Sequence, residues 1–208
     1  VQTCALPISP FDYYYNTTTG TNAITVTTTE PTLATLPSNI DFTGFTGSNL
    51  STVFPGWSEA LGTAQNSNPA GTTSAWTSST VLGGTTAKIN LFLATRNEWI
   101  ISPRVTLSAA SRITYKVAMT EFAGAAADGD GGMVGTDDKV QLMISTDGCG
   151  AVWTALETFD SAKVTADVIT NALKSYTYDL SAYTSQTVQL AFKATDGPLD
   201  ETPDYDFH

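Results

Sequence analysis

The chain has 208 residues, with 9 Lys+Arg against 20 Asp+Glu and a formal net charge of −11. This length fits one good-sized domain, or one domain plus a fragment of a neighbour. The acidic balance excludes a sequence-independent nucleic-acid binder, which needs a basic face, and it disfavours docking on anionic lipid. No apolar run approaches the ~20 residues of a spanning helix, so we expect no membrane insertion.

Threonine dominates the polar composition. The chain holds 36 threonines, against six lysines and six glutamates. Threonine suits the pleated surface of a sheet, whereas lysine and glutamate suit helices. The composition therefore predicts an all-β protein.

The first eight residues, VQTCALPI, resemble the in-frame translation of a common sequencing-library adapter. A segment of that origin is set aside when the fold is considered. We therefore expect residues 1–9 to be a sequencing artefact, the alternative being a genuine β-strand. A missing signal peptide then says nothing about export, and Cys149 is the one cysteine left to explain.

Residues 10–37 are interpreted as the end of a preceding β-domain plus a linker. Apolar residues alternate with polar ones on both sides of a turn at Gly20, at Tyr13, Tyr15, Ile24 and Val26. This pattern is typical of a β-hairpin. The proline-bounded stretch 31–37 is then the linker, and the main domain is expected over residues 38–208.

From residue 39 onward, short stretches of alternating apolar and polar residues are separated by turn-forming residues. Each stretch predicts a strand. The predicted strands are 40–45, 56–61, 74–80, 86–93, 98–102, 112–122, 139–145, 151–158, 173–180 and 187–195. Only 160–171 has room for a helical turn. This spacing predicts an antiparallel jelly-roll β-sandwich.

The last four residues, 205–208, have the alternation of a further strand. At ~3.3 Å per residue they reach only ~13 Å, less than a usual strand. We therefore expect the C-terminal strand to be truncated. It should pair beside residues 40–45 or beside a central strand, leaving part of that neighbour's backbone unpaired.

Four segments, in this order, resemble a known family. They are Ile-Asp-Phe at 40–42 leading to Pro-Gly-Trp at 55–57; Trp-Ile-Ile-Ser-Pro at 99–103; Asp-Lys-Val-Gln at 138–141 running to Ser-Thr-Asp-Gly at 145–148 and Trp-Thr at 153–154; and Tyr-Asp-Leu-Ser-Ala-Tyr at 178–183 running to Val-Gln-Leu-Ala-Phe at 188–192. Together they resemble the bacterial choice-of-anchor J domain, which is related to cleaved-adhesin modules and more remotely to the MAM sandwich.

The resemblance implies a non-catalytic, extracellular adhesive or accessory module of a larger secreted bacterial surface protein. Its partners would be a glycan or a surface protein, together with neighbouring domains of the same chain. The alternative is a carbohydrate-binding module attached to a secreted enzyme. An aromatic row exposed on one sheet or at a loop rim would favour that alternative.

Residues for the common hydrolytic sites are scarce. The single histidine, His208, is the last residue, and no Gly-x-Ser-x-Gly or His-Glu-x-x-His motif occurs. Both findings disfavour a triad or zinc hydrolase. A glycosidase needs two carboxylates across a cleft. Glu59, Glu98 and Glu121 are available, but nothing in the sequence pairs them, so we expect no enzyme activity.

The densest acidic cluster is Asp-Gly-Asp-Gly-Gly at 128–132. Ca²⁺ takes several oxygen ligands from a flexible loop, which makes Asp128 and Asp130 candidate ligands of a structural ion. The alternative is a loop without metal. The resemblance adds Asp41, because such sandwiches often carry Ca²⁺ between the first and last strands.

Tryptophan rings can stack on sugars. Three of the four, Trp57, Trp99 and Trp153, lie in segments that look structural and are expected in the core. Trp76, in Ser-Ala-Trp-Thr-Ser beside a polar loop, is the candidate ligand-binding residue, with the core as its alternative. Cys149 is either a free thiol or half of a disulfide.

Overall fold

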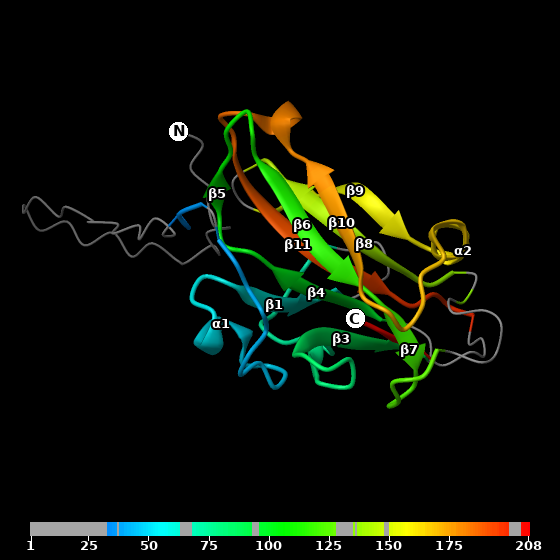
Figure 1. Cartoon of the computed structure of the whole chain (residues 1–208). Helices are drawn as coiled ribbons and strands as arrows, with labels where there is room; N and C mark the ends of the chain where they lie inside the picture. Colours follow the sequence, from blue (N-terminus) through cyan, green and yellow to red (C-terminus); the bar gives the residue numbers. More distant parts are fainter. Residues whose placement is uncertain are drawn as a thin grey trace, which may run out of the picture.

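The computed structural model describes residues 33–36, 38–62, 68–92, 96–127, 135, 137–147, 150–199 and 205–208. The predictions for residues 1–9, for most of 10–37, and for Asp128, Asp130 and Cys149 lie outside these residues. The described part consists of two antiparallel β-sheets that face each other, with short helices at their ends (Figure 1). The antiparallel β-sandwich predicted from the sequence is confirmed.

The first sheet has the strand order β1-β4-β11-β8-β9, and β5 pairs with the start of β11. Its strands are β1 (Ser58–Leu61), β4 (Asn97–Ile101), β5 (Val105–Thr106), β8 (Lys139–Ser145), β9 (Thr154–Phe159) and β11 (Thr187–Thr195). The longest strand, β11, is central because its two edges pair with β8 on one side and with β5 and β4 on the other.

The second sheet is built from β2 (Thr77–Ser79), β3 (Thr86–Leu91), β6 (Arg112–Val117), β7 (Met119–Glu121), β10 (Lys174–Asp179) and β12 (Tyr205–Phe207). The order β2-β3-β12-β7 continues into the pair β6-β10 because only Ala118 separates β6 from β7. Ala118 is itself paired: its N–H donates to the His208 carbonyl (3.1 Å), and its carbonyl accepts from the His208 N–H (2.9 Å). The expected strand 112–122 is therefore one run with a short interruption.

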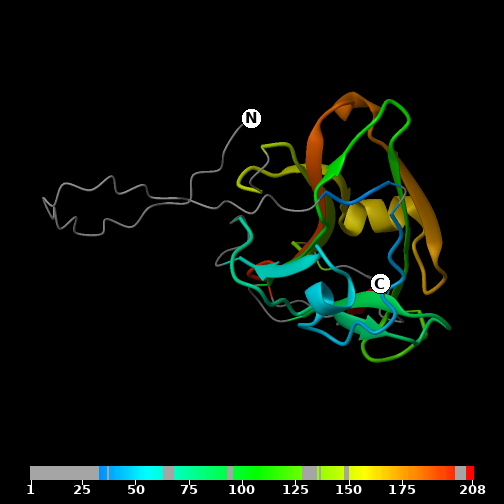
Figure 2. The same ribbon diagram turned by 90° about the vertical axis from the view of Figure 1, so that its left-hand side faces the viewer.

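Helix α2 (Ser161–Asp167) and the 3-10 turn η1 (Ser181–Tyr183) lie in connections between the sheets, and helix α1 (Leu50–Val53) precedes the first strand. Helix α2 starts at an Asp160 cap, whose carboxylate accepts the Lys163 N–H at 2.9 Å. It lies at one end of the sandwich, where the chain crosses from β9 to β10 (Figure 1), and in the turned view the yellow helix is seen between the two layers (Figure 2). It buries Val164. The helical turn expected within 160–171 is confirmed.

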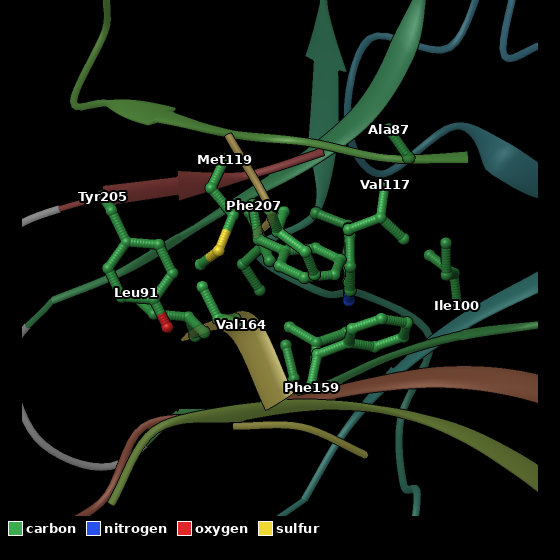
Figure 3. Packing of buried hydrophobic residues seen from close by; sticks show 14 of the residues in the cluster. Ala87, Leu91, Ile100, Val117, Met119, Phe159, Val164, Tyr205 and Phe207 are labelled. Carbon is green, nitrogen blue, oxygen red and sulfur yellow. The ribbon is translucent and has the colours of Figure 1, made fainter. Parts of the chain in front are cut away.

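The core fills the space between the sheets. Alternation places Ala87, Ile89 and Leu91 of β3 inward, each 6 % exposed or less. In Figure 3 the rings of Phe159 and Phe207 face each other from opposite sheets, with centroids 5.7 Å apart. Full burial of such a side chain is worth roughly 1.5–3 kcal/mol.

Residues 40–45 do not form the strand expected from their alternation. The Asp41 carboxylate accepts the Thr43 N–H at 3.0 Å, and Phe42 and Gly44 have φ of 58° and 83°. A side-chain bond two residues ahead followed by left-handed backbone makes a turn, not a strand. The last strand, β12, pairs instead with β3 and β7, in the middle of the second sheet, which is the central position that the sequence left open.

Candidate functional site in the cleft over the first sheet

The outer face of the first sheet carries its own apolar cluster. Ile100 and Phe192 point into the core, so their strand neighbours point to the opposite face. That cluster is Ala60, Trp99, Ile101, Met143 and Ala191, with Trp153 packed on it. The solvent-exposed face of an antiparallel sheet normally carries polar residues, so an apolar cluster here indicates that loops or a ligand cover this face.

Two indoles and a lysine form the middle of this face. The rings of Trp99 and Trp153 lie 5.3 Å apart, tilted by 53°. Lys193, opposite Trp99 in the ladder, places its ammonium 5.1 Å from the Trp99 ring. Burial lowers the pKa of Lys193. Trp99 is fully covered and donates its indole N–H to Asn97 Oδ1 at 2.7 Å, whereas Trp153 is only partly buried.

The position of Trp153 depends on the loop between β8 and β9. The Asp147 carboxylate accepts the N–H groups of Gly150 (2.8 Å), Ala151 (3.0 Å) and Val152 (2.7 Å). The Trp153 indole N–H donates to the Gly150 carbonyl at 2.8 Å. Gly150 has a φ of +66°, which disfavours other residues, so the sequence of this loop fixes its turn.

A second loop forms the facing wall. Leu61 and Ala70 exchange backbone hydrogen bonds, and Asn68 Nδ2 donates to the Ala151 carbonyl at 2.7 Å. The two loops are thus tied together beside the sheet. Between them lies a cleft of about 400 Å³.

The cleft combines an aromatic ring with neutral polar groups. Its lining includes Trp153, Gln189, Ser51, Ser58 and Thr72. Among the described residues, one charged side chain, Glu59, belongs to the lining. Glu59 is 5 % exposed, and its carboxylate accepts hydrogen bonds from Ser48 N–H, Leu50 N–H and Ser74 Oγ, at 3.0–3.2 Å. Glu59 therefore anchors α1, and the surface offered to a ligand is neutral.

The structure places the candidate Trp76 elsewhere. Trp76 is 3 % exposed, belongs to the inter-sheet core and donates its indole N–H to the Glu98 carbonyl at 3.2 Å. Trp76 therefore lies in the core, which was the alternative to its being a ligand-binding residue. Trp153, expected in the core, is partly buried and lines the cleft over the first sheet. The polar Ser-Thr-Asp-Gly stretch at 145–148 indicates a loop just before Trp153, and it is the one feature of the sequence that could have predicted a position near the surface.

The other candidate residues do not converge. Asp41 is exposed and makes its own turn. Within the described ranges, no three His, Cys, Asp or Glu side chains form a group that could hold a metal ion. Glu98 accepts the Ala75 N–H at 2.9 Å, a structural role. None of the helices among the described residues is long and apolar enough to cross a membrane.

His208 is a buried part of the second sheet. It is 5 % exposed, and its ring nitrogens lie 3.0 Å from Thr86 Oγ1 and 3.1 Å from Thr120 Oγ1. Burial lowers the pKa of His208 to about 4. The imidazole is therefore neutral near pH 7 and hydrogen-bonded on both sides.

A buried carboxyl pair lies where β8 begins and β11 ends. Asp138 and Asp196 are 6 % and 2 % exposed and share a hydrogen bond. Burial raises the pKa of Asp138 to about 6 and, together with the charge of Asp138, raises that of Asp196 to about 7. The pair is thus partly protonated near neutral pH.

No protein-family model matches the chain, and no curated protein matches it. Among solved structures, the chain is similar to the xylan-binding module CBM15, with 15 % identity and a TM-score of 0.37, over 74 % of this chain and 90 % of that one. It is also similar to Xylanase10C from Cellvibrio japonicus in complex with xylopentaose, with 12 % identity and a TM-score of 0.34. That match covers 73 % of this chain and 25 % of the xylanase. Likenesses at this level assign neither a family nor a function.

Proposed function

We propose that this domain is a carbohydrate-binding module and that the cleft over the first sheet is its binding site. The observation that carries the proposal is the partly exposed indole of Trp153 beside the neutral side chains of Gln189, Ser58 and Thr72, in a cleft of about 400 Å³. An indole face complements the apolar face of a sugar ring, and hydroxyl and amide groups hydrogen-bond its hydroxyls. The cleft is large enough for a small part of a glycan chain, so a longer chain would run past it.

The charge of the site favours a neutral glycan. The one charged residue in the described lining, Glu59, is a carboxylate already satisfied by three donors. A sulfated or uronic acid chain would meet no cation among the described lining residues, and a protein of net charge −11 would repel it.

The proposed role is non-catalytic. The Glu59 carboxylate is occupied by backbone donors, and His208 lies in the second sheet with both ring nitrogens hydrogen-bonded. Retention on a glycan is therefore the function that this site supports. The domain would serve a larger secreted protein as an accessory module outside the cell.

The test is binding of the whole chain to a panel of soluble neutral and acidic polysaccharides, by affinity electrophoresis and calorimetry. We expect at least one neutral glycan to bind, and we expect Trp153→Ala and Gln189→Ala each to weaken binding about tenfold or more. Phe122→Ala is the matched control, because Phe122 is an aromatic residue, 56 % exposed, in the turn that follows β7 of the second sheet. Binding that Phe122→Ala weakens as much as Trp153→Ala, in variants with unchanged circular dichroism, would refute the site. No binding to any neutral glycan would refute the function.

An adhesive role toward a protein is the second candidate. The observation that favours it is the apolar groove of about 1100 Å³ between the two sheets, in a different part of the molecule.

A further inference from the structure

The outer face of the second sheet carries polar side chains that are more buried than those of a solvent-facing surface. Figure 3 shows Tyr205 and Phe207 of β12 among the core residues, so Asp206 between them points to the opposite face. Asp206 is 1 % exposed, and its neighbours Thr120 and His208 are 0 % and 5 % exposed. Water is therefore largely excluded from this carboxylate.

A lysine of the neighbouring strand contacts this carboxylate. Lys88 lies on β3, which pairs with β12, and its Nζ is 2.5 Å from Asp206 Oδ2. The Ala123 N–H donates to the same oxygen at 3.0 Å. The other oxygen, Oδ1, is buried and has no hydrogen-bond partner among the described residues. The carboxylate thus has two donors on one oxygen and none on the other.

The surroundings hold Lys88 against Asp206. The Lys88 ammonium lies 5.9 Å from the centre of the Phe122 ring, and the Lys88 side chain is 18 % exposed. The neighbouring His208 imidazole is neutral near pH 7, because burial lowers its pKa to about 4, and it brings no competing charge. Removal of two charges from water is costly, and an ion pair with an unpartnered oxygen recovers only part of that cost.

We propose that Lys88 and Asp206 join in an isopeptide bond, which the folded chain forms by itself. The Nζ lone pair attacks Asp206 Cγ, which is one covalent bond away from the contacted Oδ2. The Nζ–Cγ bond forms, the Cγ–Oδ1 bond breaks, and Oδ1 leaves as water with two of the three ammonium protons. Nothing is oxidised or reduced, and no co-reactant is needed. This cross-link is separate from the proposed glycan cleft and does not depend on it.

The groups around the pair suit this reaction. The Ala123 N–H can stabilise the negative charge that develops on Oδ2 during the attack, as a donor of an oxyanion hole does. In the product, Oδ2 is the amide oxygen and keeps this hydrogen bond, whereas the oxygen without a partner has left. The fixed contact between the two groups replaces an encounter in solution, which greatly accelerates a reaction of this kind.

The cross-link fastens β12 into the sheet. Lys88 and Asp206 are 118 residues apart in the sequence, so the bond closes a long loop. A covalent closure of this length restricts the unfolded chain, as a disulfide does. The strand that completes the centre of the second sheet would then stay attached to β3 even when its hydrogen bonds break.

The test is the mass of the whole purified chain, measured by mass spectrometry after denaturation. We expect a mass lower than that of the sequence by one water molecule. A tryptic digest should lack the cut after Lys88, because trypsin does not cleave after an acylated lysine, and the peptide 194–208 should be attached at that residue. A full mass in protein whose circular dichroism shows a folded β-domain would overturn the proposal. So would a loss of water that maps to another residue, such as a cyclic imide at an aspartate.

Two lysine variants distinguish the cross-link from an ordinary ion pair. Lys88→Arg keeps the positive charge beside Asp206, so it should fold, and we expect it to have the full mass of its sequence. Lys163→Arg is the matched control, because Lys163 also makes ion pairs, with Glu157 and Asp167 at 2.9 and 2.8 Å. We expect Lys163→Arg to keep the loss of one water molecule. Loss of water in Lys88→Arg, or a full mass in folded Lys163→Arg, would refute the assignment.

Discussion

The buried pair Asp138 and Asp196 makes a pH dependence that runs opposite to ordinary acid denaturation. The ordinary pKa of an aspartate is 3.8, and burial with the neighbouring carboxyl raises that of Asp196 to about 7. The folded state therefore binds more protons than the unfolded chain between about pH 4 and pH 7. Stability from this pair falls as the pH rises through that window and stays low above it.

The magnitude follows from the same values. At ~1.36 kcal/mol per pKa unit, a rise from 3.8 to about 7 corresponds to about 4 kcal/mol. We assign this figure to the pair as a whole, because two coupled carboxyls titrate together. The positive charge of Arg96 opposes the rise at Asp196, and Asp137 adds to it.

Asp196→Asn removes the ionisation but keeps the shape. We expect it to raise the free energy of unfolding by about 2–4 kcal/mol at pH 8 and by little at pH 4. Urea denaturation of wild type and variant, followed by tryptophan fluorescence from pH 4 to 8.5, gives the difference at each pH. The comparison uses the difference between variant and wild type because His208 also makes stability depend on pH. Its pKa is lowered to about 4, so its contribution to stability is lost as the pH falls from about 6.5. That contribution cancels between the two proteins.

The control is Asp179→Asn, the same chemical change at an exposed carboxylate. Hydrogen bonds from Ser181 lower the pKa of Asp179, so this variant should show no gain at pH 8. A gain for Asp196→Asn that is equal at pH 4 and pH 8 would refute the reasoning, since it would owe nothing to ionisation.

Three further changes test other parts of the structure. Phe207→Ala should cost about 3–5 kcal/mol in urea denaturation, because the ring is 3 % exposed and faces Phe159; a cost below 1 kcal/mol would mean that β12 is not part of the core. Asp147→Ala should lower stability by about 1–3 kcal/mol and abolish glycan retention, since it frees the donors of the loop that positions Trp153; unchanged retention would separate the loop from the site. If Asp128 and Asp130 bind Ca²⁺, chelator should lower the melting temperature and added Ca²⁺ should restore it; equal melting in both conditions would remove the calcium prediction.

Alternation in the sequence predicted most strands, because a residue facing the core must be apolar whatever its neighbours are. It failed at 40–45, where the Asp41 side chain bonds the backbone and the chain turns. Local hydrogen bonds of that kind compete with pairing and leave the apolar pattern unchanged. For residues 205–208 the sequence predicted a strand but not which strands it pairs with, since pairing across more than a hundred residues depends on the whole topology.

The candidate site was harder to predict because this sandwich has apolar residues on both faces of one sheet. Trp99 and Ile100 are adjacent and both 1 % exposed, yet one lies under the cleft and the other in the core. A sequence pattern identifies the two faces but not which one a loop will cover. Trp76 and Trp153 both follow polar stretches, and only the loop hydrogen bonds of Asp147 distinguish their surroundings.

The central place of β12 has a consequence for how the chain folds during synthesis. The pairs Leu91↔Tyr205 and Met119↔Phe207 join segments that leave the ribosome far apart in time. Until β12 emerges, β3 and β7 each have an open edge, and the apolar side chains that later meet Tyr205 and Phe207 face water. Sheets dominated by such distant pairings fold slowly, and their open edges favour aggregation. While this chain is being synthesised, there should therefore be a long interval in which its open strand edges can pair wrongly unless a chaperone covers them.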